Sequence, residues 1–144
     1  MAVVSSETLH ATTVAIDGLA VVIEGHAGAG KSDLALRLID RGAMLVSDDR
    51  TLVVRTGAGL LARAPHLMAG RIEVRGVGIA SMPHLDEAPV ALLIRLDSEQ
   101  PRMPERRRRM IAGVEVRMLT IDPRANAAPI AIEIALRQPE ATPA

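Results

Sequence analysis

The chain has 144 residues, 49% of them hydrophobic, with no Phe, Tyr, Trp or Cys and a formal net charge of zero at pH 7. This composition excludes base stacking on aromatic rings, disulfides and thiolate metal sites, and it offers no broad basic surface, so we expect no nucleic-acid partner. The length indicates one domain, 1–144, with a tail that frays from about residue 138, and the lack of a signal-peptide pattern or a membrane-length apolar run favours a cytoplasmic protein without a membrane partner.

The N-terminal part of the sequence predicts a β-hairpin followed by a helix. Two β-rich runs, residues 12–16 and 19–23, flank Asp17-Gly18, which is a strong signal for a tight turn. Residues 31–41 carry apolar side chains at helical spacing, and Gly42 supplies a C-terminal stop.

The rest of the chain is mainly β-rich. Apolar or alternating runs predict strands at residues 44–46, 51–54, 60–62, 72–74, 90–96 and 114–121. The second and third of these runs form a hairpin around Gly57 and Gly59, and residues 129–137 form a last helix, although that stretch also fits a strand. The pattern therefore predicts an α/β fold with a mixed sheet, hairpin extensions and few helices.

The stretch EGHAGAGKSD, residues 24–33, has the spacing of a phosphate-binding P-loop and lies between a predicted strand and a predicted helix. Glycines let the backbone N–H groups turn toward a phosphate, and the following helix adds the positive end of its dipole. The chain has one lysine, Lys31, beside sixteen arginines, and a planar arginine fork replaces a P-loop lysine poorly. The predicted nucleotide-binding residues are Gly25, His26, Ala27, Gly28, Ala29, Gly30, Lys31 and Ser32, with His26 as a spacer.

The class of P-loop protein depends on what accompanies the loop. A GTPase would need a second lysine for base recognition, and the chain has none. The strand at residues 44–46 ends at Asp48 and Asp49, and a right-handed crossover would place it parallel to the P-loop strand and near it. There, one carboxylate can accept a proton while the other supports a metal, but Ser-Asp-Asp is equally an ordinary strand-end turn. Asp97, which ends another strand, fits a turn better.

These segments, followed by residues 72–79, which include the run EVRGVGI, together resemble the catalytic domain of the HPr kinase/phosphorylase family over about residues 8–135. The resemblance implies a P-loop kinase-like fold and a bacterial enzyme that uses ATP and Mg²⁺ to phosphorylate a serine of HPr, a small phosphocarrier of the phosphotransferase system. Members of the family also run the reverse, phosphorylase reaction. Because family members commonly carry an additional N-terminal domain, the chain is expected to be a short form without it.

The resemblance also implies roles for individual residues. Lys31 and Ser32 take the P-loop roles, Asp49 becomes the general base toward the target serine, and Glu73 becomes a second Mg²⁺ ligand beside Ser32. Asp48, the other carboxylate of the acidic pair, is expected from the residues themselves to support the metal. His10 and Arg106 match two further catalytic positions of the family, although any of the four consecutive arginines at residues 106–109 could align with the second position. Without the family, Glu73 is a solvated strand carboxylate, His10 a surface histidine, and the arginine run at residues 106–109 a solvated loop or a surface that attracts an acidic partner.

Two departures from the family pattern bear on function. The segment linked to the phosphorylase reaction reads Val-Arg-Pro-Gly-Arg-Asn in the family, whereas residues 121–126 here read IDPRAN, which predicts a weak or lost phosphorylase activity. The C-terminal helix is short, so a homo-oligomer is possible but not fixed. Two other functions stay open: a small-molecule kinase with lid arginines between residues 102 and 109, and a non-catalytic ATP-sensing module that binds a partner.

Overall fold

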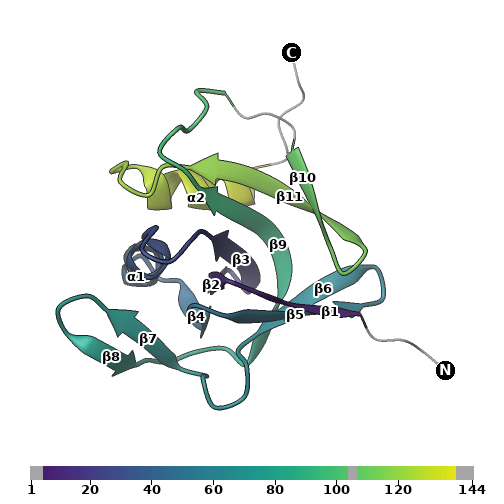
Figure 1. Ribbon diagram of the computed structural model, residues 1–144. Coiled ribbons are helices and arrows are strands. Elements are labelled where there is room, and N and C mark those ends of the chain that lie inside the picture. The colour runs from purple at the N-terminus through teal and green to yellow at the C-terminus, as the bar shows by residue number, and fades with distance from the viewer. Residues whose placement is uncertain (1–4, 104–106, 139–144) are drawn as a thin grey trace.

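The computed structural model describes residues 5–103 and 107–138 (Figure 1). Its two helices are α1 (Lys31–Asp40) and α2 (Ala128–Arg137). Its strands are β1 (Ser6–Leu9), β2 (Ala11–Ile16), β3 (Leu19–Glu24), β4 (Met44–Ser47), β5 (Thr51–Thr56), β6 (Gly59–Arg63), β7 (Arg71–Val74), β8 (Gly78–Ser81), β9 (Glu87–Leu96), β10 (Arg107–Ile111) and β11 (Val114–Ile121). Within these residues, neither helix is long and apolar enough to cross a membrane. The predicted mixed sheet with hairpins and few helices is confirmed.

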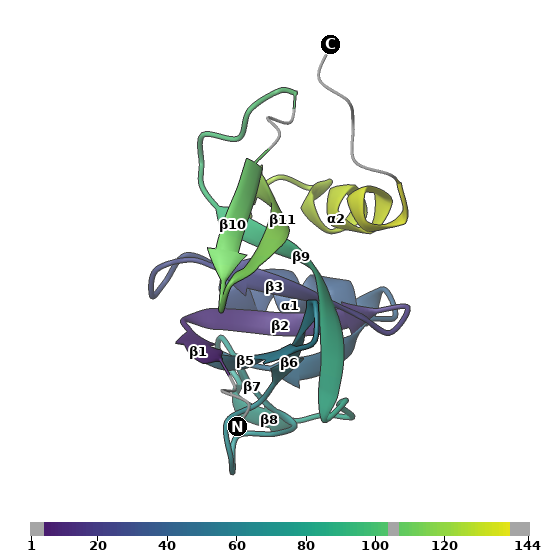
Figure 2. The ribbon, with the colours of Figure 1, turned by 90° about the vertical axis from the view of Figure 1, so that its right-hand side faces the viewer.

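The main sheet has nine strands, with β1-β5-β6-β9-β3-β2-β4 as its path and β11, paired with β10, attached to β9. The long strand β9 pairs with β6 through its first residues and with β11 through its last ones, while β3 lies parallel to it on the other side. The sheet therefore curls, and the β10–β11 hairpin stands at the opposite end of the molecule from the separate β7–β8 hairpin (Figures 1 and 2).

Most of the predicted elements are found, including the hairpins β2–β3 and β5–β6. β4, which was predicted to lie near the P-loop strand β3, is one strand away from it and pairs with β2. Because β9 already occupies the other edge of β3, β4 can only add to the free edge of β2. It is antiparallel to β2, as β3 is, so the predicted parallel direction of β3 and β4 is confirmed.

The strand runs read from the sequence did not include β8 or β10. β8 completes a hairpin with β7, and β10 contains three of the four consecutive arginines, which the sequence had suggested to be a solvated loop. Only Ile111 of β10 is fully buried, so the strand has no alternation of apolar and polar residues by which its sequence could be recognised.

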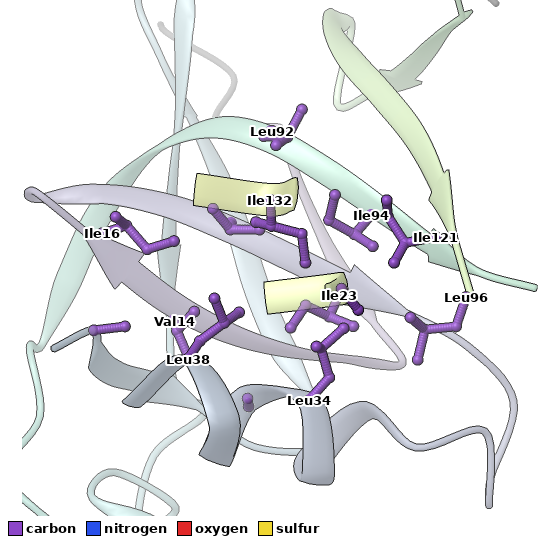
Figure 3. Packing of buried hydrophobic residues seen from close by; sticks show 14 of the residues in the cluster. Val14, Ile16, Ile23, Leu34, Leu38, Leu92, Ile94, Leu96, Ile121 and Ile132 are labelled. Carbon is purple, nitrogen blue, oxygen red and sulfur yellow. The ribbon is translucent and has the colours of Figure 1, made fainter. Parts of the chain in front are cut away.

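The central strands are buried on both faces, which is why their sequences are apolar runs rather than alternating patterns. Val21 and Ile23 of β3 belong to the core cluster that α1 and α2 cover, and Ala20 and Val22 face a second cluster enclosed by the curled sheet. Figure 3 shows side chains of both helices meeting those of β2, β3 and β9 in the first cluster. Ile72 of β7 also joins this cluster, so the small β7–β8 hairpin is anchored beside α1.

Most of the sequence motifs lie at one edge of the sheet, the border that is formed by the ends of strands and not by an outer strand. The carboxyl ends of β3, β9 and β11 meet there, because these strands are parallel with Glu24 opposite Arg95 and Ile121 opposite Leu96. The end of β4 lies at the same edge, since Ser47 pairs with Thr13 near the start of β2. In α/β sheets ligands bind at the carboxyl ends of the strands, so this edge is the candidate site.

Candidate active site

The glycine-rich loop runs from the end of β3 to the start of α1 as the sequence predicted. A Cβ on Gly25 would lie 2.9 Å from the Cβ of Ala29, so the loop can close only with glycine at this position. Gly30 has φ 101° and caps the N-terminus of α1, in a backbone conformation that other residues rarely adopt. The loop therefore has the strand, tight turn and helix N-terminus that define a P-loop anion site.

Lys31, the chain's single lysine, is 7% exposed and points back over this loop. Its Nζ donates hydrogen bonds to the carbonyl oxygens of Gly25, at 2.8 Å, and His26, at 3.3 Å. The ammonium is thus held at the mouth of the loop by two acceptors that an incoming phosphate can replace. His26 itself is exposed and bonds through Nδ1 to the carbonyl of its neighbour Ala27, consistent with a spacer.

Asp48 joins three parts of the site through one buried carboxylate, which is 7% exposed. Its Oδ1 accepts hydrogen bonds from Ser32 Oγ, at 2.6 Å, and from Thr12 Oγ1, at 2.9 Å. Its Oδ2 accepts the backbone N–H of Glu73, at 2.9 Å. The start of α1, strand β2 and the β7–β8 hairpin therefore converge on Asp48.

Asp49 is exposed, whereas the carboxylate of its neighbour Asp48 is buried. It has φ 64°, and the N–H of Arg50 donates to the Asp48 carbonyl at 2.7 Å, so Asp49 is the central residue of a γ-turn with positive φ. The Asp49 N–H donates to Thr12 Oγ1 at 3.1 Å, while the side chain is exposed and has no hydrogen-bond or ion-pair partner within residues 5–103 and 107–138. The turn thus buries one carboxylate and presents the other to solvent at the same edge.

The three remaining candidate residues are His10, Glu73 and Arg106, and they differ in their relation to this edge. His10 is exposed directly before β2, whose first residue, Ala11, pairs with Glu24 at the entrance to the P-loop, so His10 belongs to this edge. Glu73 reaches Asp48 through its backbone, whereas its side chain is exposed on β7. Arg106 lies outside the described residues.

A magnesium ion would need oxygen ligands near the phosphates. In the described part of the chain, no three His, Asp or Glu side chains gather into a metal site of their own. Ser32 Oγ and Asp48 Oδ1, already 2.6 Å apart, supply one hydroxyl and one carboxylate oxygen, and Mg²⁺ in nucleotide sites takes its remaining ligands from waters and phosphates. This donor set fits the ion.

Sequence reasoning missed three contacts that shape the site. Thr12 binds Asp48, Arg109 pairs with the carboxylate of Glu24 immediately before the P-loop, and Arg37 donates to the carbonyls of Pro123 and Ala125. Each contact joins residues separated by 36 or more positions. No local motif signals such partners, so only the fold reveals them.

The mixed sheet, the glycine-rich loop and the carboxylates at its mouth define an α/β domain of the P-loop type. A family model described as the HPr Serine kinase C-terminal domain matches residues 2–140. The chain belongs to this family, and the resemblance seen in its sequence is confirmed.

Individual relatives agree with this assignment. A protein named HPr kinase/phosphorylase from Clostridium botulinum strain Eklund 17B is 31% identical over 126 residues, which cover 78% of this chain and 41% of that protein. Another of that name, from Clostridium acetobutylicum, is 42% identical over 77 residues, or 54% of this chain and 25% of its own length. The chain thus spans less than half the length of these relatives.

A solved structure titled Hpr(Ser) kinase/phosphatase from Coxiella burnetii superposes with a TM-score of 0.80 and 31% sequence identity. The match covers 91% of this chain and 94% of that one. The curled sheet with two helices is therefore the fold of that protein as well.

Proposed function

We propose that this protein is a Mg-ATP-dependent serine kinase whose substrate is an HPr-type phosphocarrier protein of the phosphotransferase system. The observation that carries the proposal is the hydrogen bond from Ser32 of the P-loop to buried Asp48, beside the outward-facing carboxylate of Asp49. This arrangement combines a phosphate-binding loop with an exposed base. The choice of HPr as the acceptor rests on the relatives named HPr kinase/phosphorylase.

In the proposed reaction, the P-loop amides and Lys31 bind the β and γ phosphates of ATP. Mg²⁺, held by Ser32 with Asp48 and assisted by Glu73, would neutralise phosphate charge. Asp49 accepts the proton of the acceptor serine hydroxyl while the serine oxygen forms a bond to the γ-phosphorus. The bond between the γ-phosphorus and the bridging oxygen breaks, and ADP leaves with that oxygen. Such a base contributes about 10²–10⁴ in rate, and positioning with charge neutralisation does the rest.

His10 and Arg106 are proposed to lie near the phosphates of the bound nucleotide. For His10 the support is its place beside the P-loop entrance; for Arg106 it is the sequence resemblance alone. The changed segment at residues 121–126 supports a phosphorylase activity that is weak or lost. A cytoplasmic location and a possible homo-oligomer complete the proposal.

The test is to incubate the purified protein with Mg-ATP and the HPr-type carrier of the same organism and to read the carrier by intact-mass spectrometry. One added phosphate on a carrier serine, lost in Asp49→Asn, is the expected result. ATP binding without transfer to the carrier would contradict the proposed acceptor. Transfer to a metabolite instead would indicate a small-molecule kinase, and tight ATP binding without turnover would indicate a nucleotide-sensing module.

A further inference from the structure

The loop between β11 and α2, residues 122–127, lies against the end of the P-loop. A Cβ placed on Gly30 would be 3.5 Å from the Cβ of Pro123, which is van der Waals contact. Gly30 is the residue whose φ of 101° directs the chain from the loop into α1. The 122–127 loop therefore lies beside the P-loop at Gly30, where the P-loop backbone must keep an unusual conformation.

Arg37, farther along α1, holds the same loop from a second point. Its Nη2 donates to the carbonyl of Pro123, and its Nη1 donates to the carbonyl of Ala125 at 3.4 Å. Its Nε lies 3.5 Å from Asp33 Oδ2, one turn earlier on the helix, an ion pair without a hydrogen bond. Gly30 and Arg37 are seven positions apart, or about 10 Å along the helix axis, so the loop lies beside the N-terminus of α1 and is bonded to the helix at Arg37.

We propose that Arg37 is a positioning residue that holds the 122–127 loop against Gly30 and thereby keeps the P-loop in the shape that receives the phosphates of a nucleoside triphosphate. The inference rests on the proposed function, because it assigns Arg37 a role in nucleotide binding at the same site. A loop already fixed before binding loses less conformational entropy when the ligand arrives, so affinity depends on such contacts.

The planar fork of arginine is what this geometry requires. Two carbonyl oxygens, from residues two positions apart, are reached by two nitrogens of one guanidinium. A lysine ammonium is a single point of charge on a flexible stem and does not present two donors in a fixed plane. Arg37→Lys therefore keeps the charge beside Asp33 but loses the double contact.

The chain offers a matched control at the C-cap of the same helix. Arg41 also pairs with the C-terminal part of the chain, through its Nε and Glu133 Oε1 at 2.6 Å, but its partner lies on α2 and not on the 122–127 loop. Arg41→Ala removes an arginine and its ion pair at the C-cap of α1 without changing a contact of the 122–127 loop. The Tm of each variant shows whether Arg37→Ala and Arg41→Ala are folded to a similar extent.

The experiment combines amide hydrogen exchange by NMR, without nucleotide, with calorimetric titration of Mg-ATP. The informative amides are those of Ala29 and Leu34, which bond to the carbonyls of His26 and Gly30, and that of Ala125, which bonds to Asp122. In Arg37→Ala and Arg37→Lys we expect faster exchange at all three and a Kd for Mg-ATP raised about tenfold, the size of effect of one charged hydrogen bond. Arg41→Ala should match the wild type in both.

Unchanged exchange in Arg37→Ala, or equal acceleration in Arg41→Ala, would overturn the proposal. Full restoration by Arg37→Lys would also overturn it, because charge alone would then suffice. A wild-type protein that binds no ATP would contradict the proposed function instead, and the exchange data would still decide the role of Arg37.

Discussion

Ser32 Oγ donates a 2.6 Å hydrogen bond to Asp48 Oδ1, so the last residue of the P-loop motif and the carboxylate at the end of β4 are in direct contact. The contact forms although β2 lies between the P-loop strand and β4. Thr12 of that intervening strand donates to the same oxygen. The intervening strand thus becomes part of the site instead of separating its two halves.

Replacing Asp48 with Asn should weaken both fold and activity. The carboxylate accepts three hydrogen bonds, and an amide NH₂ cannot accept, so at least one buried donor loses its partner. We expect the free energy of unfolding to fall by about 2 kcal/mol, measured by urea titration. Asp40→Asn, at an exposed position at the end of α1, is the control and should change stability little. Equal stability of the two variants would contradict the role given to Asp48.

Lys31→Ala should abolish tight nucleotide binding while the protein stays folded. The ammonium contacts two loop carbonyls here and is expected to contact phosphates when ATP is bound. Loss of these charge-assisted bonds should raise the Kd for Mg-ATP by about 10- to 100-fold, measured by calorimetry. Lys31→Arg should not restore affinity, because the guanidinium is too large for the loop. An unchanged Kd in Lys31→Ala would count against a P-loop nucleotide site.

The sequence predicted those parts of the site that depend on local pattern. The spacing of Gly25, Gly30 and Lys31 fixes the loop, and the apolar face of residues 34–38 fixes the helix after it, because both signals lie within one short segment. The acidic pair also ends a strand where it was expected. The different surroundings of Asp48 and Asp49, however, come from the γ-turn and from Thr12, and neither feature has a sequence signature.

Long-range pairing could not be read from the sequence. The position of β4 depends on which edge of the hairpin is free, and the arginine-rich β10 pairs with β11 although most of its side chains face solvent. Arg109 reaches Glu24 across 85 positions, and the P-loop entrance gains an ion pair that no local rule indicates. Polar contacts of this kind follow from topology, whereas hydrophobic periodicity reports only which face of an element is buried.

Glu73→Gln should separate the backbone role of this residue from its side-chain role. The hydrogen bond to Asp48 uses the Glu73 N–H, which glutamine retains, and the exposed carboxylate adds little stability, so the free energy of unfolding should change by less than about 0.5 kcal/mol. As a proposed Mg²⁺ ligand, the carboxylate should matter for the metal: we expect the Mg²⁺ concentration for half-maximal transfer to rise about tenfold. Glu115→Gln, which changes another exposed strand glutamate, should leave this Mg²⁺ concentration unchanged. If both variants behave alike, Glu73 is only a solvated strand residue.

Asp49→Gly should remove phosphate transfer without destabilising the protein. Asp49 holds φ 64°, which costs a residue with a Cβ on the order of 1–3 kcal/mol and costs glycine far less. The N–H that bonds to Thr12 is retained. Relief of this strain offsets the extra entropy of glycine in the unfolded chain, so the free energy of unfolding should stay equal or rise by up to about 1 kcal/mol.

The control for Asp49→Gly is Asp86→Gly, which changes an exposed aspartate that does not have positive φ. Because no strain is relieved there, the entropy of glycine should lower the free energy of unfolding by roughly 0.4–1 kcal/mol, measured by urea titration, while transfer to the carrier continues. If Asp49→Gly is destabilised as much as Asp86→Gly, the γ-turn stores no strain. A stable but inactive Asp49→Gly would mean that the turn keeps an unfavourable backbone in order to present one carboxylate.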